Sequence, residues 1–319
     1  MITAFYSGRH RLHAPAQGYE DERPAAYPEV PQRLDVTIAA LSALAGVRLI
    51  EVGPASVPEL LTVHSSVLVD GLREISESLG PGEVYQPWPG RDANFWVMSA
   101  PVTAGTYTAA CHSAGCALAA AEAVRSGDPI AIALCRPPGH HAGRTTCGGF
   151  CYFNNAALAA QSLSLHGTVG VLDIDYHHGH GTQDIFYRRG DVAYASLHAD
   201  TRHEYPYHFG RSHETGAGEG LGWNHNLPLP RDCGPDLYLA TLDRALDWLK
   251  GKDPRGLVVS LGFDTCKLDP FGGLGLEPDS YGLVSRKIRA LGRPMVIVFE
   301  GGYDLAALGP CWKSFIGGL

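Results

Sequence analysis

A cluster of acidic and imidazole side chains follows the apolar run at residues 169–172. The run is rich in apolar and β-branched side chains, which predicts a buried strand. Asp173, Asp175, His177 and His178 come directly after it. In an extended chain, alternation places Asp173, Asp175 and His177 on one side. We expect Asp175 and His177 to share one divalent metal ion, because carboxylate and imidazole groups are ligands that suit zinc.

A hydrogen-bonded histidine–aspartate group in the core would be a second explanation of this cluster, because buried acids and imidazoles must be paired or bound to metal. The metal site is favoured because three other predicted strands also end in polar side chains. In a parallel sheet these ends meet at one edge, where α/β proteins bind ligands. The side chains are His140 and His141 after residues 130–134, Asp264 after residues 257–261, and Tyr303 after residues 295–299.

Together these residues predict metal-assisted hydrolysis of an amide or ester. Asp264 would be the third ligand, and three protein ligands leave an open position for water, whose pKa zinc lowers to about 7. His140 or His141 would take the proton of the water and return it to a leaving amine. Tyr303 would stabilise the oxyanion. Taken singly, Asp264 at a strand end is more often a cap, and Tyr303 is most simply a packed aromatic. Arg33 either lies in solvent or reaches under the site.

Predicted strands and helices alternate along the chain, which is typical of an α/β fold with a mainly parallel sheet. The chain contains no repeat, low-complexity segment or linker, so residues 1–319 are expected to form one domain. Strands are expected at residues 2–6, 47–52, 130–134, 169–172, 192–197, 257–261 and 295–299. Helices are expected at residues 32–44, 58–79 with a break near Ser65, 103–126 with Thr103 as N-cap, 155–165, from 182 onward, 235–250, 278–291, and at the end of the chain.

Residues 8–31, 81–101 and 201–226 are expected to be irregular, and the first is expected to contribute to the rim of the site. Residues 81–101 are rich in aromatic side chains and contain Glu83 and Asp92. This segment would suit the rim of a pocket for a cationic substrate. It would equally suit a subunit contact, where aromatic side chains are also enriched.

The composition excludes several classes of protein. A formal net charge of −8 without a Lys/Arg-rich patch argues against nucleic-acid binding, and it weakly favours a cationic substrate. The 8 cysteines form no Cys-x-x-Cys pair, so we expect reduced thiols and a cytoplasmic protein. The sequence contains no leader and no apolar run long enough to span a bilayer, so no membrane association is expected.

Several motifs resemble those of the arginase-like histone deacetylase superfamily, and within it those of the bacterial acetylpolyamine amidohydrolases. The resemblance implies a three-layer α-β-α fold with a mainly parallel sheet of about eight strands. It also implies a deacetylase. The motifs are Arg-Pro-Pro-Gly-His-His-Ala at residues 136–142, Gly-Gly-Phe-Cys-Tyr-Phe-Asn-Asn-Ala at 148–156, Asp-Ile-Asp-Tyr-His-His-Gly-His-Gly at 173–181, Gly-Phe-Asp-Thr-Cys-Lys-Leu-Asp-Pro at 262–270, and Glu-Gly-Gly-Tyr at 300–303.

The resemblance also implies a role for individual residues. Zinc, or alternatively ferrous iron, would be held by Asp175, His177 and Asp264. His141 would be the general base and acid, His140 would be a supporting imidazole paired with Asp173, and Tyr303 would stabilise the oxyanion. Potassium would be bound by Asp173 and by main-chain or hydroxyl oxygens of Asp175, His177, Ser196 and Leu197. The substrate tunnel would be lined by Gly149, Phe150 and an aromatic side chain near Tyr207.

The sequence departs from the family pattern in three places. His180 stands where the family commonly has Asn or Asp, at the position that orients His141, and an imidazole there can titrate. Phe271 stands at the tunnel rim, where a smaller or linear side chain is common. The acidic insertion that helps acetylpolyamine enzymes to bind a distal ammonium is poorly matched, and Glu83 and Asp92 are its only candidates.

These observations leave four hypotheses. The first is a zinc-dependent amidohydrolase of acetylpolyamines or similar small cationic amides, and the second is an acyl-lysine deacylase of proteins or peptides. The third is an acyl-group binding protein with little activity, which the complete ligand set and Tyr303 argue against. The fourth is a ureohydrolase with two manganese ions. A homodimer is expected, with residues 81–101 as the contact and rim.

Overall fold

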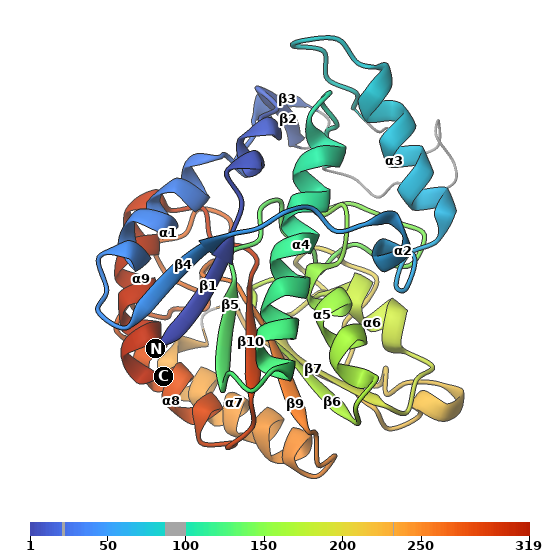
Figure 1. Cartoon of the computed structure of the whole chain (residues 1–319). Coiled ribbons are helices and arrows are strands. Elements are labelled where there is room, and N and C mark those ends of the chain that lie inside the picture. Colours follow the sequence, from blue (N-terminus) through green and yellow to red (C-terminus); the bar gives the residue numbers. More distant parts are fainter. Residues whose placement is uncertain (21–22, 87–99, 232) are drawn as a thin grey trace.

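The protein is described here by a computed structural model of residues 1–20, 23–86, 100–231 and 233–319 (Figure 1). Eight parallel strands form the main sheet in the order β4-β1-β5-β10-β9-β6-β7-β8. This result confirms the expected α/β class and the expected size of the sheet. The strands are β1 Ile2–Tyr6, β4 Val47–Glu51, β5 Ile130–Ala133, β6 Val169–Asp173, β7 Val192–Ala199, β8 Asn224–Leu229, β9 Gly256–Leu261 and β10 Met295–Phe299.

The central strands are buried on both faces. All residues of β5, β6, β9 and β10 are buried, as expected of parallel strands that are covered by helices on each side. Alternate side chains of these strands enter two separate hydrophobic clusters, one on each face of the sheet. The result is three layers, in which α4 and α5 cover one face and α1, α7, α8 and α9 cover the other (Figure 1).

The helices begin and end close to their expected positions. The expected break near Ser65 is confirmed, because the Ser65 hydroxyl accepts a hydrogen bond from Leu68 N and starts a new helix there. The helices are α1 Gln32–Ser42, α2 Val57–Leu60, α3 Ser66–Ser78, α4 Thr106–Arg125, α5 Asn155–Ser164, α6 His180–Phe186, α7 Gly234–Lys250, α8 Ser280–Arg289 and α9 Leu305–Gly318, with short 3-10 turns at Gly8–Leu12 and Gly218–Gly220.

Three expectations about local structure are wrong. The expected loop at residues 8–31 contains the antiparallel pair β2 Gln17–Glu20 and β3 Arg23–Ala26. The expected irregular stretch at residues 201–226 ends in β8, which contains Pro228 and pairs only at the edge of the sheet, where a proline is tolerated. The N-cap of α4 is Gly105 rather than Thr103, whose hydroxyl instead bonds the Thr106 side chain at 3.0 Å.

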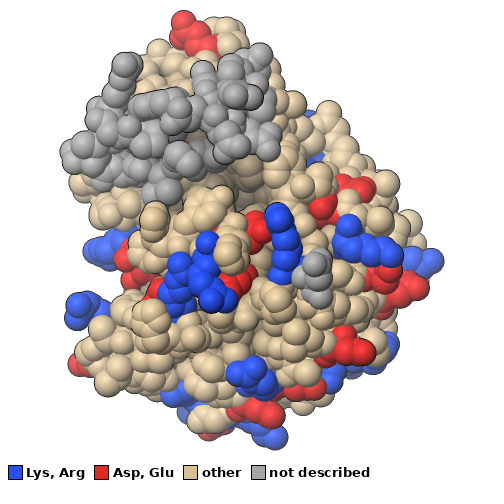
Figure 2. Space-filling view, turned by 180° about the vertical axis from the view of Figure 1, so that it is seen from behind, with Lys and Arg blue, Asp and Glu red and all other residues tan. Residues whose placement is uncertain are grey.

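The surface carries charges of both signs. Figure 2 shows Lys and Arg side chains interspersed with Asp and Glu on the face opposite to the view of Figure 1. Within the described part of the chain, no helix is both long and apolar enough to cross a membrane.

Candidate active site

Two neighbouring strands bring three potential metal ligands together. Asp175 and His177 follow β6, and Asp264 follows β9, which pairs directly with β6. One ligand atom of each residue lies within 4.8 Å of the others. His177 Nδ1 lies 3.2 Å from Asp264 Oδ2 and 3.4 Å from Asp175 Oδ1. The structure therefore joins the three residues that were expected to bind the metal.

The electrostatics of this triad fit a bound cation. Asp175 and Asp264 are almost completely buried. Burial and the nearby charge of Asp175 raise the pKa of Asp264 to about 7. Burial alone would lower the pKa of His177, but hydrogen bonds to both carboxylates outweigh it and raise the pKa to about 9. Two buried carboxylates that oppose each other's ionisation, beside one imidazole, form a donor set that suits zinc with an open coordination position.

Backbone amides orient the two carboxylates. Asp264 Oδ1 accepts a hydrogen bond from Tyr176 N at 2.9 Å. Asp175 accepts bonds from His177 N and Gly301 N, both at 2.8 Å. Such bonds fix the direction of the remaining lone pairs and so determine where a metal ion can bind.

His140 is paired with an aspartate behind it. Its Nδ1 lies 3.2 Å from Asp173 Oδ2, which also accepts a hydrogen bond from Tyr194 OH at 3.0 Å. Burial alone would lower the pKa of His140, but the charges of Asp175 and Asp173 outweigh it and raise the pKa to about 10. The structure thus makes the His140–Asp173 pair that the sequence predicted.

His141 has a second imidazole as its partner. Its Nδ1 lies 3.2 Å from His180 Nδ1, and the ring of Tyr205 packs edge-on against it with centroids 4.9 Å apart. Burial and the charge of His140 lower the pKa of His180 to about 3, so His180 is neutral at pH 7. Burial and the neighbouring imidazoles also lower the pKa of His141. This neutral pair makes His141 Nδ1 the donor to His180 whenever His141 Nε2 acts as a base.

Tyr303 lies on the loop after β10 and faces the same site. Its amide donates a hydrogen bond to Asp269 Oδ2 at 2.5 Å. The guanidinium of Arg33 lies 4.7 Å from the centroid of its ring and donates to Gly302 O at 2.5 Å. Burial raises the pKa of Tyr303, against the opposing effect of Arg33. The phenol therefore stays protonated at neutral pH and can donate a hydrogen bond, and Arg33 does reach under the site.

Aromatic side chains surround the approach to these groups. Phe150 packs against Tyr303 with ring centroids 5.8 Å apart, and Phe271 packs against it from another side at 5.4 Å. Gly149 has a φ of 54°, and a Cβ there would lie 2.5 Å from His141 Cδ2, so this position requires glycine. Gly149, Phe150 and Phe271 all lie at the site, as expected.

The expected aromatic at Tyr207 needs a refinement. Tyr205 is the side chain that contacts His141, and it also lies near His177 and His180. Tyr207 is half exposed and packs on Tyr205 with centroids 6.4 Å apart. Both aromatics flank Pro206, so the sequence pattern placed an aromatic here but could not select the residue that points inward.

The remaining expected site residues are only partly brought together. Ser196 pairs in register with Asp173 across β7 and β6, and the adjacent Leu197 is buried, so both lie on the neighbouring strand at the end of β6 that carries Asp173. Glu83 is exposed and its carboxylate accepts a hydrogen bond from Gly80 N at 2.7 Å. Asp92 lies outside the described residues.

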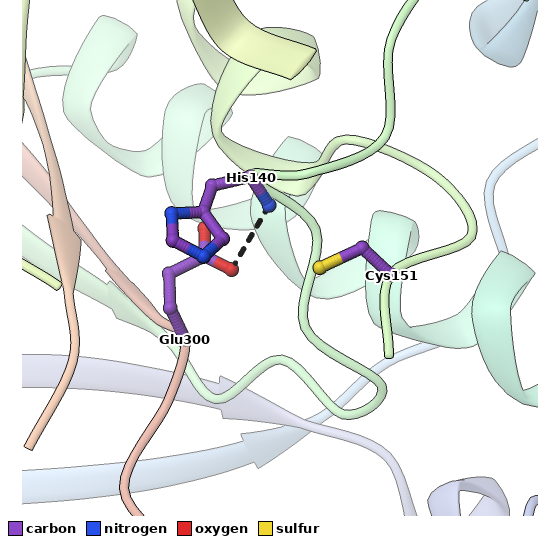
Figure 3. Close-up of side chains that lie close together, drawn as sticks. All are labelled: His140, Cys151 and Glu300. Carbon is purple, nitrogen blue, oxygen red and sulfur yellow. Dashed lines mark hydrogen bonds between the residues drawn. The ribbon is translucent and has the colours of Figure 1, made fainter. Parts of the chain in front are cut away.

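His140 also belongs to a second group of side chains that are of metal-ligand types. His140, Cys151 and Glu300 point toward one another (Figure 3). Burial raises the pKa of the Cys151 thiol, which keeps it protonated. Glu300 Oε2 already accepts hydrogen bonds from two backbone amides. Sequence reasoning did not single out Glu300, and this group has no free ligand set for a metal.

Comparison with known proteins assigns the fold and the site to a family. Residues 27–319 match the model of the histone deacetylase domain, and they contain the triad, both active-site histidines and Tyr303. The chain belongs to the histone deacetylase family. It is therefore a deacetylase, and the enzymes of this family depend on a metal ion. The triad is a group of side chains with the spacing to hold such an ion.

Several members of the histone deacetylase family resemble the chain over most of its length. It is 40% identical to acetylpolyamine amidohydrolase 1 of Pseudomonas aeruginosa, covering 97% of this chain and 96% of that protein. It is 35% identical to the histone deacetylase-like amidohydrolase of the same organism, covering 97% of this chain and 81% of that protein. The crystal structure of acetylpolyamine aminohydrolase from Burkholderia pseudomallei superposes with a TM-score of 0.93 at 39% identity, covering 100% of this chain and 98% of that one.

Proposed function

We propose that the enzyme is a zinc-dependent amidohydrolase that removes acetyl groups from N-acetylated amines, and that its substrates are acetylpolyamines or similar small cationic amides. The observation that carries the reaction is the Asp175–His177–Asp264 triad, with the ring of His141 packed edge-on against His177 and with Tyr303 close enough for the charges of Asp264 and Asp175 to raise its pKa. The substrate class is supported by the relatives named as acetylpolyamine amidohydrolases and by the net charge of −8.

The side chains of the site divide the chemistry among them. A zinc ion held by the triad would polarise the amide carbonyl and acidify a water molecule. His141 Nε2 would be the proton acceptor of the site, with its Nδ1 hydrogen directed to His180 Nδ1, which lies 3.2 Å away. His140 is held by Asp173 and keeps a positive charge near the developing negative charge. Tyr303 donates a hydrogen bond to the carbonyl oxygen as it becomes an oxyanion. The proton on His141 then passes to the leaving amine.

The same site would hold two metal ions of different roles. Zinc, with ferrous iron as the alternative, would occupy the triad. Potassium would be bound at Asp173, with oxygen atoms of Ser196 and Leu197 on the neighbouring strand and main-chain oxygens of Asp175 and His177. Metal analysis of the purified enzyme tests this assignment. Two manganese ions per chain would instead support the ureohydrolase alternative.

The second candidate is an acyl-lysine deacylase. It is supported by the similarity to a histone deacetylase-like amidohydrolase. It is also supported by Glu83, a candidate to bind the distal ammonium of a polyamine, because its carboxylate already accepts a hydrogen bond from Gly80 N in its own loop. Comparing kcat/KM for N-acetylputrescine with that for an acetyllysine peptide tests the choice. We expect the small amine to be preferred at least about tenfold, which corresponds to about 1.4 kcal/mol of binding in the transition state. A clear preference for the peptide would overturn the polyamine assignment.

We also propose that the enzyme is a cytoplasmic homodimer built as one catalytic domain, with residues 81–101 at the contact. Much of that segment lies outside the described residues. The mass in solution, measured by light scattering for the full chain and for a variant with Glu83→Ala, tests the proposal. A monomer at micromolar concentration would contradict it.

A further inference from the structure

Glu300 connects two loops that carry different parts of the proposed chemistry. Its backbone opens the segment that leads through Gly301 and Gly302 to Tyr303. Its side chain reaches the backbone of the turn at Gly139 and His140, which His141 follows (Figure 3). The proposed proton-transfer residue and the proposed oxyanion donor are thus joined through one side chain.

The carboxylate of Glu300 is fully buried and fully used. Oε2 accepts hydrogen bonds from Gly139 N at 2.7 Å and from His140 N at 3.2 Å, and Oε1 accepts one from Ser260 Oγ at 3.3 Å. Burial raises the pKa of Glu300 to about 7, and the hydrogen bond from Gly139 N acts against that rise. A buried carboxyl group is unfavourable unless it is paired in this way. Gly139 and His140 are the two residues that set the direction of the imidazole pair.

The backbone at Glu300 is held as firmly as its side chain. Its amide donates to Leu261 O at 2.9 Å, and its carbonyl accepts a hydrogen bond from Arg33 at 2.5 Å. The next amide, Gly301 N, donates to Asp175 Oδ2. The position of the Glu300 side chain is therefore fixed relative to the triad. The turn at Gly139 and His140, which is hydrogen-bonded to that side chain, is fixed relative to the triad as well.

We infer that Glu300 is a positioning residue, which holds the turn of His140 and His141 at a fixed distance from Tyr303 and from the triad. The inference rests on the proposed roles of His141 and Tyr303. In this role Glu300 contributes to the reaction through the turn that it holds, and not through a contact with the substrate or the metal. We call the two hydrogen bonds from Gly139 N and His140 N to Glu300 Oε2 the clasp. A misplacement of reacting groups by about 1 Å costs about 100-fold in rate, so loss of the clasp is expected to lower turnover more than substrate binding.

Three variants separate the hydrogen bonds of Glu300 from its charge and length. Glu300→Gln keeps an oxygen that can accept from both amides, and we expect it to retain turnover within about fivefold. Glu300→Asp keeps the charge but loses the reach of one methylene, and Glu300→Met loses the acceptors altogether. For these two we expect kcat to fall by about 10- to 100-fold, with KM within about twofold of the parent value.

Ser260→Ala is the matched control, because it removes the hydrogen bond to Oε1 and leaves both amide bonds to Oε2. We expect its kcat to stay within about threefold of the parent value. Zinc content and a cooperative thermal transition are measured for every variant. If Glu300→Met does not fold, Glu300→Asp carries the test alone.

Two further measurements distinguish positioning from general support of the fold. Hydrogen–deuterium exchange of peptides covering residues 136–141 is expected to rise in Glu300→Asp but not in Glu300→Gln. The loss of kcat caused by Glu300→Asp is expected to be smaller in a Tyr303→Phe background, because the effects of substitutions at residues that act together on one step are not additive.

The results have distinct meanings. A parent enzyme that cleaves no acetylated amine would overturn the proposed function and leave exchange of the turn as the test of the clasp. An active parent with unchanged kcat in Glu300→Asp and Glu300→Met would overturn the clasp. A loss of zinc in step with the loss of kcat, or full additivity with Tyr303→Phe, would also overturn it.

Discussion

Tyr303 presents a phenol whose proton is retained because burial raises its pKa. Replacing it with phenylalanine removes one hydrogen-bond donor and leaves the triad untouched. We expect Tyr303→Phe to bind zinc and an N-acetylated amine as the parent does, and to lose about 100- to 1,000-fold in kcat, the usual effect of deleting an oxyanion donor. Steady-state kinetics with metal analysis tests this. Turnover near that of the parent would mean that another group holds the oxyanion.

His180 should control the acid side of the pH–rate profile. The base form of His141 is needed for turnover, so activity falls when the pH drops through the pKa of His141, and burial and nearby imidazoles hold that pKa low. His180→Asn keeps a hydrogen-bond acceptor and removes one of the neighbouring imidazoles that lower the pKa of His141. We expect it to remain active, with the acid limb moved to higher pH.

A second substitution sharpens this test. His180→Asp places a negative charge next to His141 and should move the acid limb further, by about one pH unit or more. The measurement is kcat/KM between pH 4.5 and 8. If both variants keep the acid limb of the parent, His180 does not act on His141.

Individual residues were predictable where a motif specified both type and spacing. The triad, both histidines and Tyr303 follow strand ends. The structure brings the three ligands of the triad together, packs His141 against His177, and places Tyr303 where the charges of Asp264 and Asp175 act on it. Tyr205 and Glu300 were missed for physical reasons. Which of the two tyrosines flanking Pro206 points inward depends on tertiary packing. The two backbone amides that bond Glu300 are 161 and 160 residues away in sequence, beyond any local pattern.

At the scale of elements, His64 fastens the loop after the histidine turn to the start of α5. Its Nδ1 donates to Gly143 O at 2.8 Å, and its Nε2 accepts from Asn154 N at 2.9 Å. Asn154 in turn caps α5 through Ala157 N at 2.8 Å. Because Nε2 is an acceptor, His64 must be neutral, and burial lowers its pKa to about 4.

This geometry predicts a loss of stability in acid. The pKa of His64 is lower in the folded state than in the unfolded state, so its contribution is complete above about pH 6.5 and is lost as the pH falls toward 4. His64→Gln can make both hydrogen bonds and cannot titrate. Between pH 7 and pH 4.5 we expect the free energy of unfolding of this variant to fall by about 2–3 kcal/mol less than that of the parent.

Urea denaturation at the two pH values measures this difference. His208→Gln, at an exposed position, is the control and should behave as the parent does. Equal losses of stability in His64→Gln and in the parent would show that His64 is not held neutral by the fold.

Elements with a strong apolar pattern were predictable, whereas weakly patterned ones were not. The buried strands β5, β6, β9 and β10 in the centre of the sheet form continuous apolar runs in the sequence, as parallel strands do. β8 combines two asparagines, a histidine and a proline, and it becomes a strand because β7 offers an open edge. Long-range pairing decided this element, and local propensity pointed the other way.

At the scale of the whole molecule, the triad couples metal binding to stability. Without a cation, burial and Asp175 raise the pKa of Asp264, which records a repulsion between two buried carboxylates. We expect chelation to lower the thermal midpoint and zinc to restore it. Free zinc at about 100 times its dissociation constant would stabilise the fold by about 2.7 kcal/mol. Scanning calorimetry with and without chelator measures the shift.

Asp264→Asn is the matched variant for this experiment. It removes one of the two repelling charges, so we expect the metal-free variant to be more stable than the metal-free parent at pH 8 and insensitive to zinc. The difference should shrink as the pH falls below 7, where Asp264 of the parent becomes protonated. A parent whose stability ignores both chelator and zinc would contradict the assignment of the triad.

The two aspartates of the triad follow β6 and β9, which are neighbours in the sheet but far apart along the chain. During synthesis, the ribosome delivers Asp175 well before Asp264, so the complete triad exists only after the later strand has joined the earlier one. If the triad holds the proposed ion, tight loading of that ion is thus expected to be a late event in maturation. A cell short of zinc would accumulate chains that have finished folding around two mutually repelling acids, and these would be the molecules most exposed to quality-control proteases.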